Sequence, residues 1–205
     1  MNPAEIREVL ERRGALQGGH FLLSSGRHSD LYIQKFRVFE HPRLTQRFGD
    51  ALAELFPEGF DVVASPAVGA VVLGFATALA AEARMIFAER EEGSMSFRRG
   101  FALEPHERVL VVEDVMTTGG SAREIVELVR GSGAKLVGVA AFIERADPAR
   151  DLRLGVPTRS LLKLAPTSWA PEQCPLCSAH EPLVDPGSRR LGDSSPGHEK
   201  PPPSR

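Results

Sequence analysis

Two adjacent carboxylates and a hydroxyl-rich turn follow one apolar stretch of the chain. The stretch Val109–Val112 is mostly β-branched, which is typical of a strand buried on both faces. Glu113 and Asp114 follow it directly, and the segment 117–121 then supplies two threonines, two glycines and a serine. Glycines let the backbone bend sharply and approach a ligand closely. The order predicts an acidic pair beside an anion-binding turn.

A helix is expected directly after this turn, with Ser121 as its N-cap and its end near Arg130. Glu124 would complete a capping box with Ser121. The free N–H groups of the first helical turn attract phosphate. Carboxylates repel phosphate, so Glu113 and Asp114 could instead accept hydrogen bonds from vicinal sugar hydroxyls or hold a divalent metal through water. A sugar that carries phosphates satisfies both halves of the pattern.

Two simpler interpretations would also account for parts of this segment. A P-loop NTPase also places acids after a buried strand, but the sequence contains no G-x-x-x-x-G-K-[ST] element. An ordinary strand-to-helix turn would not need two acids, two threonines, two glycines and a serine together in the segment 113–121. The phosphate-and-diol site is therefore the preferred interpretation.

The segment 109–122 resembles the phosphoribosyl pyrophosphate (PRPP) motif of the type I phosphoribosyltransferases, and the resemblance extends through about residue 165. Three other stretches resemble the orotate branch of that family. The stretch 19–32 resembles its amino-terminal segment on the orotate side, 87–90 opens what looks like its mobile catalytic loop, and 141–145 looks like the strand whose last arginine meets orotate.

The resemblance implies an α/β fold with a parallel sheet flanked by helices and a small N-terminal hood. It also implies transfer of the phosphoribosyl group from PRPP to orotate, which gives orotidine 5′-monophosphate and pyrophosphate in pyrimidine synthesis. Mg²⁺ would accompany PRPP. The family further implies a homodimer with shared active sites.

The resemblance also assigns roles to residues. Glu113 and Asp114 would hold the ribose hydroxyls, while Thr117 and Arg145 would meet orotate. Tyr32, which is the only tyrosine, could stack on the base or simply pack in the core. The turn from Thr117 to Ser121 would hold the 5′-phosphate, so the expected PRPP-binding residues are Glu113, Asp114, Val115, Met116, Thr117, Thr118, Gly119, Gly120, Ser121 and Arg90.

The polar segment 91–99 is expected to be a mobile loop. Arg90, Arg98 and Arg99 could be a solvated charged surface, or cations of a lid that stabilise the charge on departing pyrophosphate. Arg90 and Arg99, together with Asp114, are the predicted catalytic residues. The loop lacks the lysines and histidine of well-known bacterial members, and the expected pyrophosphate loop at 66–70 lacks the lysine of many relatives.

Composition limits the other possibilities. The chain has 205 residues, 42% of them hydrophobic, and a net charge of −2, so it offers no basic field for nucleic acid. No apolar run could span a bilayer and no signal-peptide core follows the N-terminus, so a cytoplasmic protein is expected. The domain plan is a phosphoribosyltransferase domain over 1–170 with its hood mainly at 15–40 and its mobile loop at 90–100, a C-terminal extension over 171–185, and a disordered tail over 186–205.

Alternating helices and strands predict a parallel sheet whose ligand lies beyond the carboxyl ends of the strands. The apolar helix 69–82 is expected to be buried all round. Further helices are expected at 3–13, 42–55 and 121–130, and strands at 21–23, 31–36, 62–65, 85–88, 109–112, 135–143 and 159–164.

Cys174 and Cys177 have the spacing of two zinc ligands. A closed site needs four ligands; His180 could be a third, and the fourth would come from elsewhere, for example a partner subunit. The simpler interpretation is a turn with two reduced thiols, which leaves no metal site built by the protein. His20 is expected to be structural, while His28 and Lys35 could meet substrate or only solvent.

Two other functions remain open. A purine-base phosphoribosyltransferase would share the PRPP motif, and the segment 19–32 argues for orotate instead. A PRPP-sensing regulator that binds nucleic acid without catalysis would keep the same fold, but the near-neutral charge and the lack of a DNA-binding helix pair argue against it.

Overall fold

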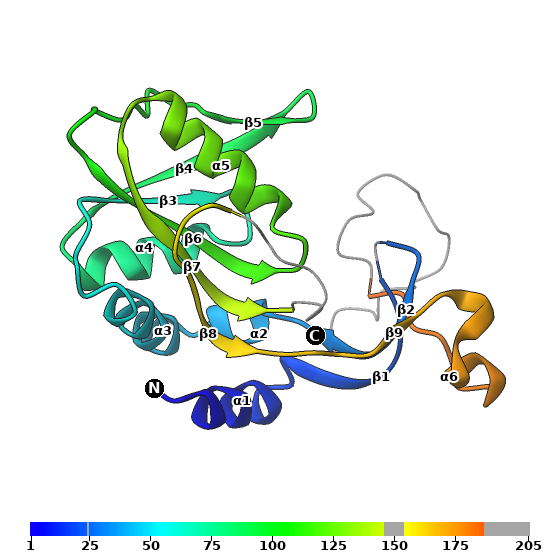
Figure 1. Cartoon of the computed structure of the whole chain (residues 1–205). Coiled ribbons are helices and arrows are strands. Elements are labelled where there is room, and N and C mark those ends of the chain that lie inside the picture. The colour runs from blue at the N-terminus through cyan, green and yellow to red at the C-terminus, as the bar shows by residue number, and fades with distance from the viewer. Residues whose placement is uncertain (24, 146–153, 187–205) are drawn as a thin grey trace, which may run out of the picture.

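A six-stranded sheet forms the centre of the molecule (Figure 1). The computed structural model describes residues 1–23, 25–145 and 154–186. The strand order is β5-β4-β3-β6-β7-β8; β4, β3, β6, β7 and β8 are parallel, and β5 is antiparallel to β4. The strands are β3 (Val62–Pro66), β4 (Arg84–Glu91), β5 (Ser94–Phe97), β6 (Arg108–Met116), β7 (Lys135–Glu144) and β8 (Thr158–Lys163).

Helices cover both faces of this sheet, which explains why its central strands are apolar throughout. Leu110 and Val112 of β6 belong to the core beneath α1 (Pro3–Arg12), α3 (Pro42–Glu54) and α4 (Val71–Ala80). Val109 and Val111 belong to a second core beneath α5 (Gly120–Gly131). Because successive strand residues point to opposite faces, the apolar run contributes side chains to both cores.

A separate three-stranded antiparallel sheet forms the hood beside the main sheet (Figure 1). Its strands are β1 (Leu16–Leu22), β2 (His28–Ile33) and β9 (Ser168–Trp169), and α2 (Phe36–Phe39) follows β2. After β9 the chain continues through the 3-10 turn η1 (Pro171–Gln173) and α6 (Pro175–Ser178). The N–H of Val184 then donates to the carbonyl of His20 at 2.8 Å, and Leu22 N–H donates back to Val184 at 2.9 Å. The C-terminal extension is therefore joined to the hood.

The prediction that the helix after β3 is buried all round is wrong. Val72, Phe75 and Leu79 of α4 are 47%, 61% and 57% exposed. One face of α4 packs against the sheet and α3, where Gly49 lets the two helices approach. The opposite apolar face is therefore largely open to solvent.

The segment 91–99, which is expected to be a mobile loop, includes the turn and the second strand of a β-hairpin. Glu91 pairs with Ser94 across a two-residue turn at Glu92 and Gly93, both with positive φ of 49° and 89°. This is the type I′ pattern, which the sequence Glu-Gly signals less clearly than Asn-Gly does. Met95 is buried and anchors β5. The segment is thus a β-hairpin.

The strand that carries the acids is longer than expected. It continues to Met116, because its pairing with β7 runs through Glu113 opposite Ala141 and Met116 opposite Glu144. The other predicted helices and strands are observed with ends that differ by a few residues, except that β1 begins at Leu16 and β2 at His28, whereas α2, β5 and the three elements after β8 were not predicted. No helix in the described ranges is long and apolar enough to cross a membrane. The predicted disordered tail lies, apart from Pro186, outside the described residues.

Candidate functional site

The acid pair is buried inside β6, close to the carboxyl end of the strand. Glu113 and Asp114 are only 7% and 5% exposed. The N–H of Val115 donates to Asp114 Oδ1 at 2.6 Å, which fixes that carboxylate. Lys35, the residue that precedes α2, places its ammonium against Asp114 Oδ2 as an ion pair. The chain thus joins the end of the hood to the acid pair through one charge contact.

The electrostatics of the pair favour hydrogen bonding to hydroxyl groups. Burial raises the pKa of Glu113 well above its usual range, and the neighbouring charge of Asp114 raises it further. The ammonium of Lys35 opposes both effects. The raised pKa favours the protonated, hydrogen-donating form of Glu113, beside an Asp114 carboxylate that accepts and is already paired. That combination suits the two hydroxyls of a diol.

The loop between β3 and α4 closes on the same carboxylates. A side chain at Gly69 would overlap Asp114 Oδ2 and would come within 2.8 Å of Lys35 Nζ. Only glycine therefore permits this approach. The peptide bond between Ala67 and Val68 in this loop is cis. The predicted pyrophosphate loop thus lies directly beside Asp114.

The turn from Thr117 to Ser121 follows the strand as predicted, but its cap differs. Gly119 is the N-cap, with a left-handed φ of 69° that favours glycine, and α5 begins at Gly120. Ser121 is therefore not the N-cap, and no capping box forms with Glu124. Glu124 instead accepts from Arg90 and from the N–H of Met95.

The side chains of this turn are free to meet a ligand. Thr117, Thr118 and Gly120 are exposed, whereas Gly119 is buried. The N–H groups of the first turn of α5 lack acceptors within the helix. Exposed hydroxyls and free N–H groups at a helix N-terminus form an anion-binding surface directly after the acids.

Arg145 lies beside this turn and faces the hood. Its backbone N–H donates to Met116 at 2.8 Å, which places it next to the end of β6. Burial lowers the pKa of the Arg145 guanidinium, and the charge of Asp30 on β2 opposes that shift. Asp30 Oδ1 is itself buried and has no hydrogen-bond partner among the described residues. A cation and an acid thus face each other across the space between hood and sheet.

Comparison with known proteins agrees with this geometry. The phosphoribosyl transferase domain matches residues 37–175. The orotate phosphoribosyltransferases of Caldanaerobacter subterraneus subsp. tengcongensis and Thermotoga maritima are 45% and 48% identical, over 93% and 91% of this chain and 100% and 99% of theirs. The chain belongs to the orotate phosphoribosyltransferase family. The crystal structure of the Aeropyrum pernix orotate phosphoribosyltransferase superposes with a TM-score of 0.68 at 28% identity, over 78% of this chain and 93% of that one.

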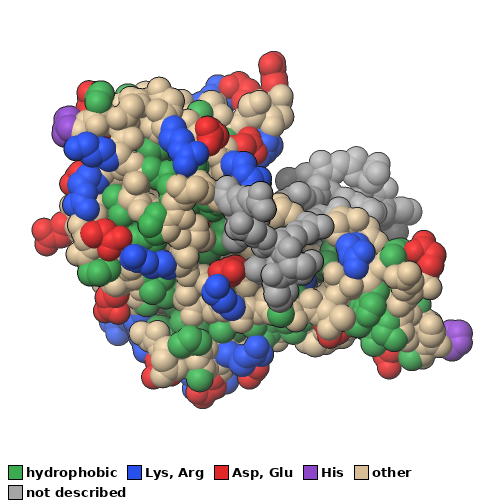
Figure 2. Space-filling view, viewed as in Figure 1, with side chains coloured by type: hydrophobic (Ala, Val, Ile, Leu, Met, Phe, Trp, Pro, Cys, Tyr) green, Lys and Arg blue, Asp and Glu red, His purple; other side chains and the backbone are tan. Residues whose placement is uncertain are grey.

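The arginines expected in the catalytic loop of this family member lie on the β4–β5 hairpin and are paired. Arg90 contacts Glu124 at 2.5 Å, Arg99 contacts Glu89 at 2.9 Å, and Arg98 contacts Glu91 at 3.0 Å. Figure 2 shows acidic and basic side chains mixed over this part of the surface. The structure does not bring these arginines into contact with the acid pair.

Tyr32 packs against Phe21, with ring centroids 5.5 Å apart, and is half-buried. This contact holds one side of the ring inside the hood. It is compatible both with simple packing and with stacking of the base on the other side. Sequence reasoning gave no role to Asp30 and left Lys35 undecided. In the sequence, the one sign of their importance is that Asp30 is a charged residue within the strand and Lys35 is a charged residue shortly after it.

The two cysteines meet two histidines, but not the one expected. His20 and His28 of the hood lie against Cys174 and Cys177, whereas His180 is exposed and is not part of the group. The expectation of a plain turn with two thiols therefore misses a four-residue cluster. Both histidines are far from the cysteines in the sequence, so no local spacing could reveal them.

Proposed function

We propose that this chain transfers the phosphoribosyl group from PRPP to orotate, giving orotidine 5′-monophosphate and pyrophosphate. The observation that carries the proposal is the buried pair Glu113 and Asp114, placed directly before an open, glycine-bounded turn at the N-terminus of α5. The names of the similar proteins supply the substrates, and the site supplies groups that suit a sugar diol and a phosphate.

The acid pair would hold the ribose hydroxyls. Asp114 accepts through an oxygen that the N–H of Val115 orients, and burial raises the pKa of Glu113, which favours its hydrogen-donating form. The turn from Thr117 to Ser121 would bind the 5′-phosphate through hydroxyls and free N–H groups. Both contacts would hold the sugar in a fixed position while the bond at C1 breaks. Fixed positioning of the reacting groups lowers the activation barrier of the transfer.

Lys35 would supply the cation that the pyrophosphate loop lacks. Relatives of this family often carry a lysine in that loop, and here the loop contains none. The ammonium of Lys35 lies beside Gly69 of the loop while it pairs with Asp114. A cation at that position can stabilise the negative charge of the leaving pyrophosphate.

Mg²⁺ would be bound together with PRPP. The carboxylate oxygens of the acid pair suit a hard cation, but Lys35 already neutralises Asp114, and Glu113 resists ionisation. Mg²⁺ would therefore be held mainly by the oxygens of bound PRPP, and less by ligands from the protein. When bound, the ion supplies positive charge at the phosphate oxygens.

Orotate would enter between hood and sheet. The planar fork of Arg145 suits a carboxylate or the edge of a pyrimidine ring. Arg145→Ala should raise the KM for orotate by about tenfold, the worth of one charge-assisted hydrogen bond, and leave the KM for PRPP within about twofold. Steady-state kinetics with each substrate varied would check this. An equal loss for both substrates would mean that Arg145 does not bind the base.

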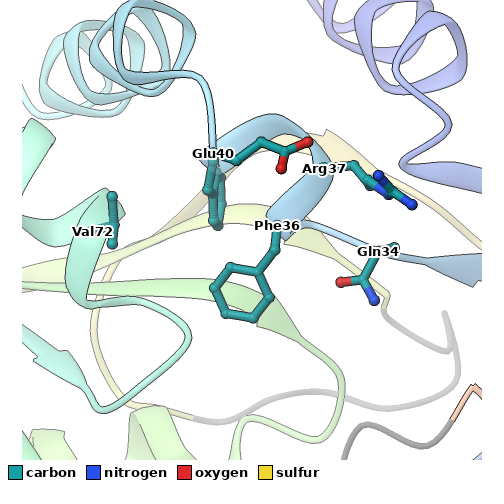
Figure 3. Close-up of a pocket in the computed structure, with 6 residues that line it drawn as sticks. Gln34, Phe36, Arg37, Glu40 and Val72 are labelled. Atoms are coloured by element: carbon teal, nitrogen blue, oxygen red, sulfur yellow. The ribbon is translucent and has the colours of Figure 1, made fainter. Parts of the chain in front are cut away.

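We also propose a homodimer, in which Arg90 and Arg99 of one hairpin serve the partner's site. Val68, Val72, Phe75 and Leu79 form an exposed apolar stripe along and before α4, and such stripes mark interfaces. A hollow of about 560 Å³ adjoins it, and Figure 3 shows side chains of α2 and α4 around it. Its lining comprises Gln34, Phe36, Arg37, Phe39, Glu40 and Val72.

Light scattering on the purified chain tests this assembly. Wild type should have twice the mass of one chain, and Phe75→Lys should shift it toward the monomer because a charge would enter an apolar interface. Arg12→Lys on exposed α1 is the matched control. A monomeric wild type would refute the dimer.

The activity itself is tested by mixing the protein with orotate, PRPP and Mg²⁺ and following the loss of orotate absorbance. Adenine, guanine and hypoxanthine in parallel reactions test the purine alternative. Turnover of a purine base without loss of orotate would replace the proposal. The predicted cytoplasmic location stays a prediction.

A further inference from the structure

The hood and the C-terminal extension meet at a cluster of two histidines and two cysteines. His20 comes from β1, His28 from β2, Cys174 from the end of η1 and Cys177 from α6. In Figure 1 the α6 segment lies beside the hood strands. The ligand atoms of all four side chains lie within 4.8 Å of one another, and three of the four residues are buried. The two thiols are not joined in a disulfide.

Four of the six distances between the ligand atoms are close to the edges of a coordination tetrahedron. Bonds of about 2.3 Å to sulfur and about 2.0 Å to nitrogen require about 3.3 Å between two nitrogens and about 3.5 Å between nitrogen and sulfur. His20 Nε2 and His28 Nδ1 are 2.9 Å apart. Sulfur-to-nitrogen distances are 3.4 Å for Cys174 to His20, 3.7 Å for Cys177 to His20 and 3.2 Å for Cys177 to His28. Small side-chain shifts would bring all four atoms to a small ion at the centre, because they already lie within 4.8 Å of one another.

The hydrogen bonding of His20 prepares it as a ligand. Its Nδ1 lies 2.9 Å from the carbonyl oxygen of Glu181, which can only accept. Nδ1 therefore carries the hydrogen, and Nε2 presents its lone pair to the cluster. A backbone carbonyl that orients a histidine in this way is a usual companion of a metal-bound imidazole.

We propose that His20, His28, Cys174 and Cys177 bind one zinc ion with a structural role. Two thiolates and two imidazoles match the preference of zinc for sulfur and nitrogen, and they disfavour Mg²⁺ or Ca²⁺, which take oxygen. Four protein ligands leave no open position for a substrate, so the ion stabilises the fold and takes no part in the reaction.

The ion would tie together parts of the chain that are distant in sequence. Cys174 is 154 residues from His20, and Cys177 is 149 residues from His28. The short β9 strand, the Val184 pairing, the contacts of Arg27 with Ser168, and the hydrogen bonds of Ser29 with Thr167 and of His20 with Glu181 also join the extension to the hood. The same hood carries Asp30 opposite Arg145, so the ion would also fix the orotate side of the site. The inference does not depend on the proposed activity, because its readouts are metal content and stability.

Metal analysis of the full chain tests the proposal. Protein purified with a thiol reductant from zinc-supplemented cells should hold about one zinc per chain, as a single closed site requires. Cys177→Ser and His20→Ala should each lower the bound zinc about tenfold or more. His180→Ala, which changes the exposed neighbouring histidine, should keep the full content. Zinc retained equally by His20→Ala would overturn the assignment.

Cobalt provides a second readout that needs no variant to fold. After zinc is stripped by a chelator, one equivalent of Co²⁺ should give the intense visible bands of a tetrahedral site and a thiolate charge-transfer band. The stripped protein should melt about 10 °C lower and recover when zinc is restored, and no recovery would overturn the structural role. Wild-type protein with two titratable thiols that binds neither ion would refute the site, and so would a native Cys174–Cys177 disulfide that forms in place of metal binding.

Discussion

The acid pair and the hairpin arginines both carry charges that the proposed reaction uses, but the fold holds them in opposite ways. Glu113 and Asp114 are nearly inaccessible within a strand that is paired on both sides. The side chains of Arg90 and Arg99 are 44% and 62% exposed near the edge of the sheet, and each is held by one carboxylate.

The acid pair is the fixed half of the site, because it is held in place before substrate arrives. The hairpin arginines are the rearranging half, because they can change partners. A buried ion pair that loses one partner leaves an uncompensated charge, so the acid site resists change. Water screens exposed ion pairs and makes them weak, so an arginine can exchange Glu89 or Glu124 for pyrophosphate at small cost. The paired hairpin is thus compatible with a later catalytic role.

The largest effect is expected from breaking the fixed half. Asp114→Asn should weaken PRPP binding about 100-fold, because a hydrogen bond to a charged group contributes about 1.5–3 kcal/mol and Lys35 loses its partner. Calorimetric titration with PRPP and Mg²⁺ measures the loss. Asp50→Asn on exposed α3 is the control. Unchanged affinity with the fold intact would remove the acid pair from the site.

A smaller loss is expected when the pyrophosphate loop is pushed away from the acids. In Gly69→Ala the new methyl group would overlap Asp114 and crowd Lys35, so kcat/KM should fall about 30-fold. Gly131→Ala is the matched control, since nothing lies within 4 Å of its added carbon. Equal rates for both variants would show that the loop tolerates a displacement.

The arginines test the rearranging half. Arg99→Ala should lower kcat about tenfold while Tm changes by less than about 2 °C, because the pair with Glu89 is exposed. Arg12→Ala, which removes an exposed pair with Glu8 on α1, should leave both unchanged. A large fall in Tm with normal kcat would make Arg99 a structural residue of the hairpin.

The smallest effect concerns stability as a function of pH. The pKa of Glu113 is raised above its usual 4.5, so above that pH the folded chain holds a proton that the unfolded chain releases. The free energy of unfolding therefore falls by about 1.4 kcal/mol per pH unit until the raised pKa is passed, and below pH 4.5 the contribution is fully present. Glu113→Gln should flatten this slope in urea titrations, whereas Glu54→Gln on the surface should not. Parallel slopes for wild type and Glu113→Gln would contradict the burial effect.

Local patterns predicted the elements that build the site. The apolar run before Glu113 gave a buried strand, and the glycine-rich turn gave the strand-to-helix junction, because both depend on neighbouring residues. The predicted N-cap at Ser121 is wrong because Glu124 does not complete a capping box. It accepts hydrogen bonds from Arg90 on β4 and from the N–H of Met95 on β5. The exposed face of α4 was missed because hydropathy reports apolar character but not which neighbours are present.

The sequence by itself determined the two-sided parallel sheet, the position of the acids near the end of its central strand and the phosphate-binding turn after them. Only the tertiary structure decided that Lys35 and Gly69 meet Asp114, that the hairpin arginines are paired, and that two hood histidines join Cys174 and Cys177. The physical reason is range. Backbone pattern and turn chemistry act over a few residues, whereas charge pairing and metal-ligand geometry depend on side chains that only the folded chain brings together.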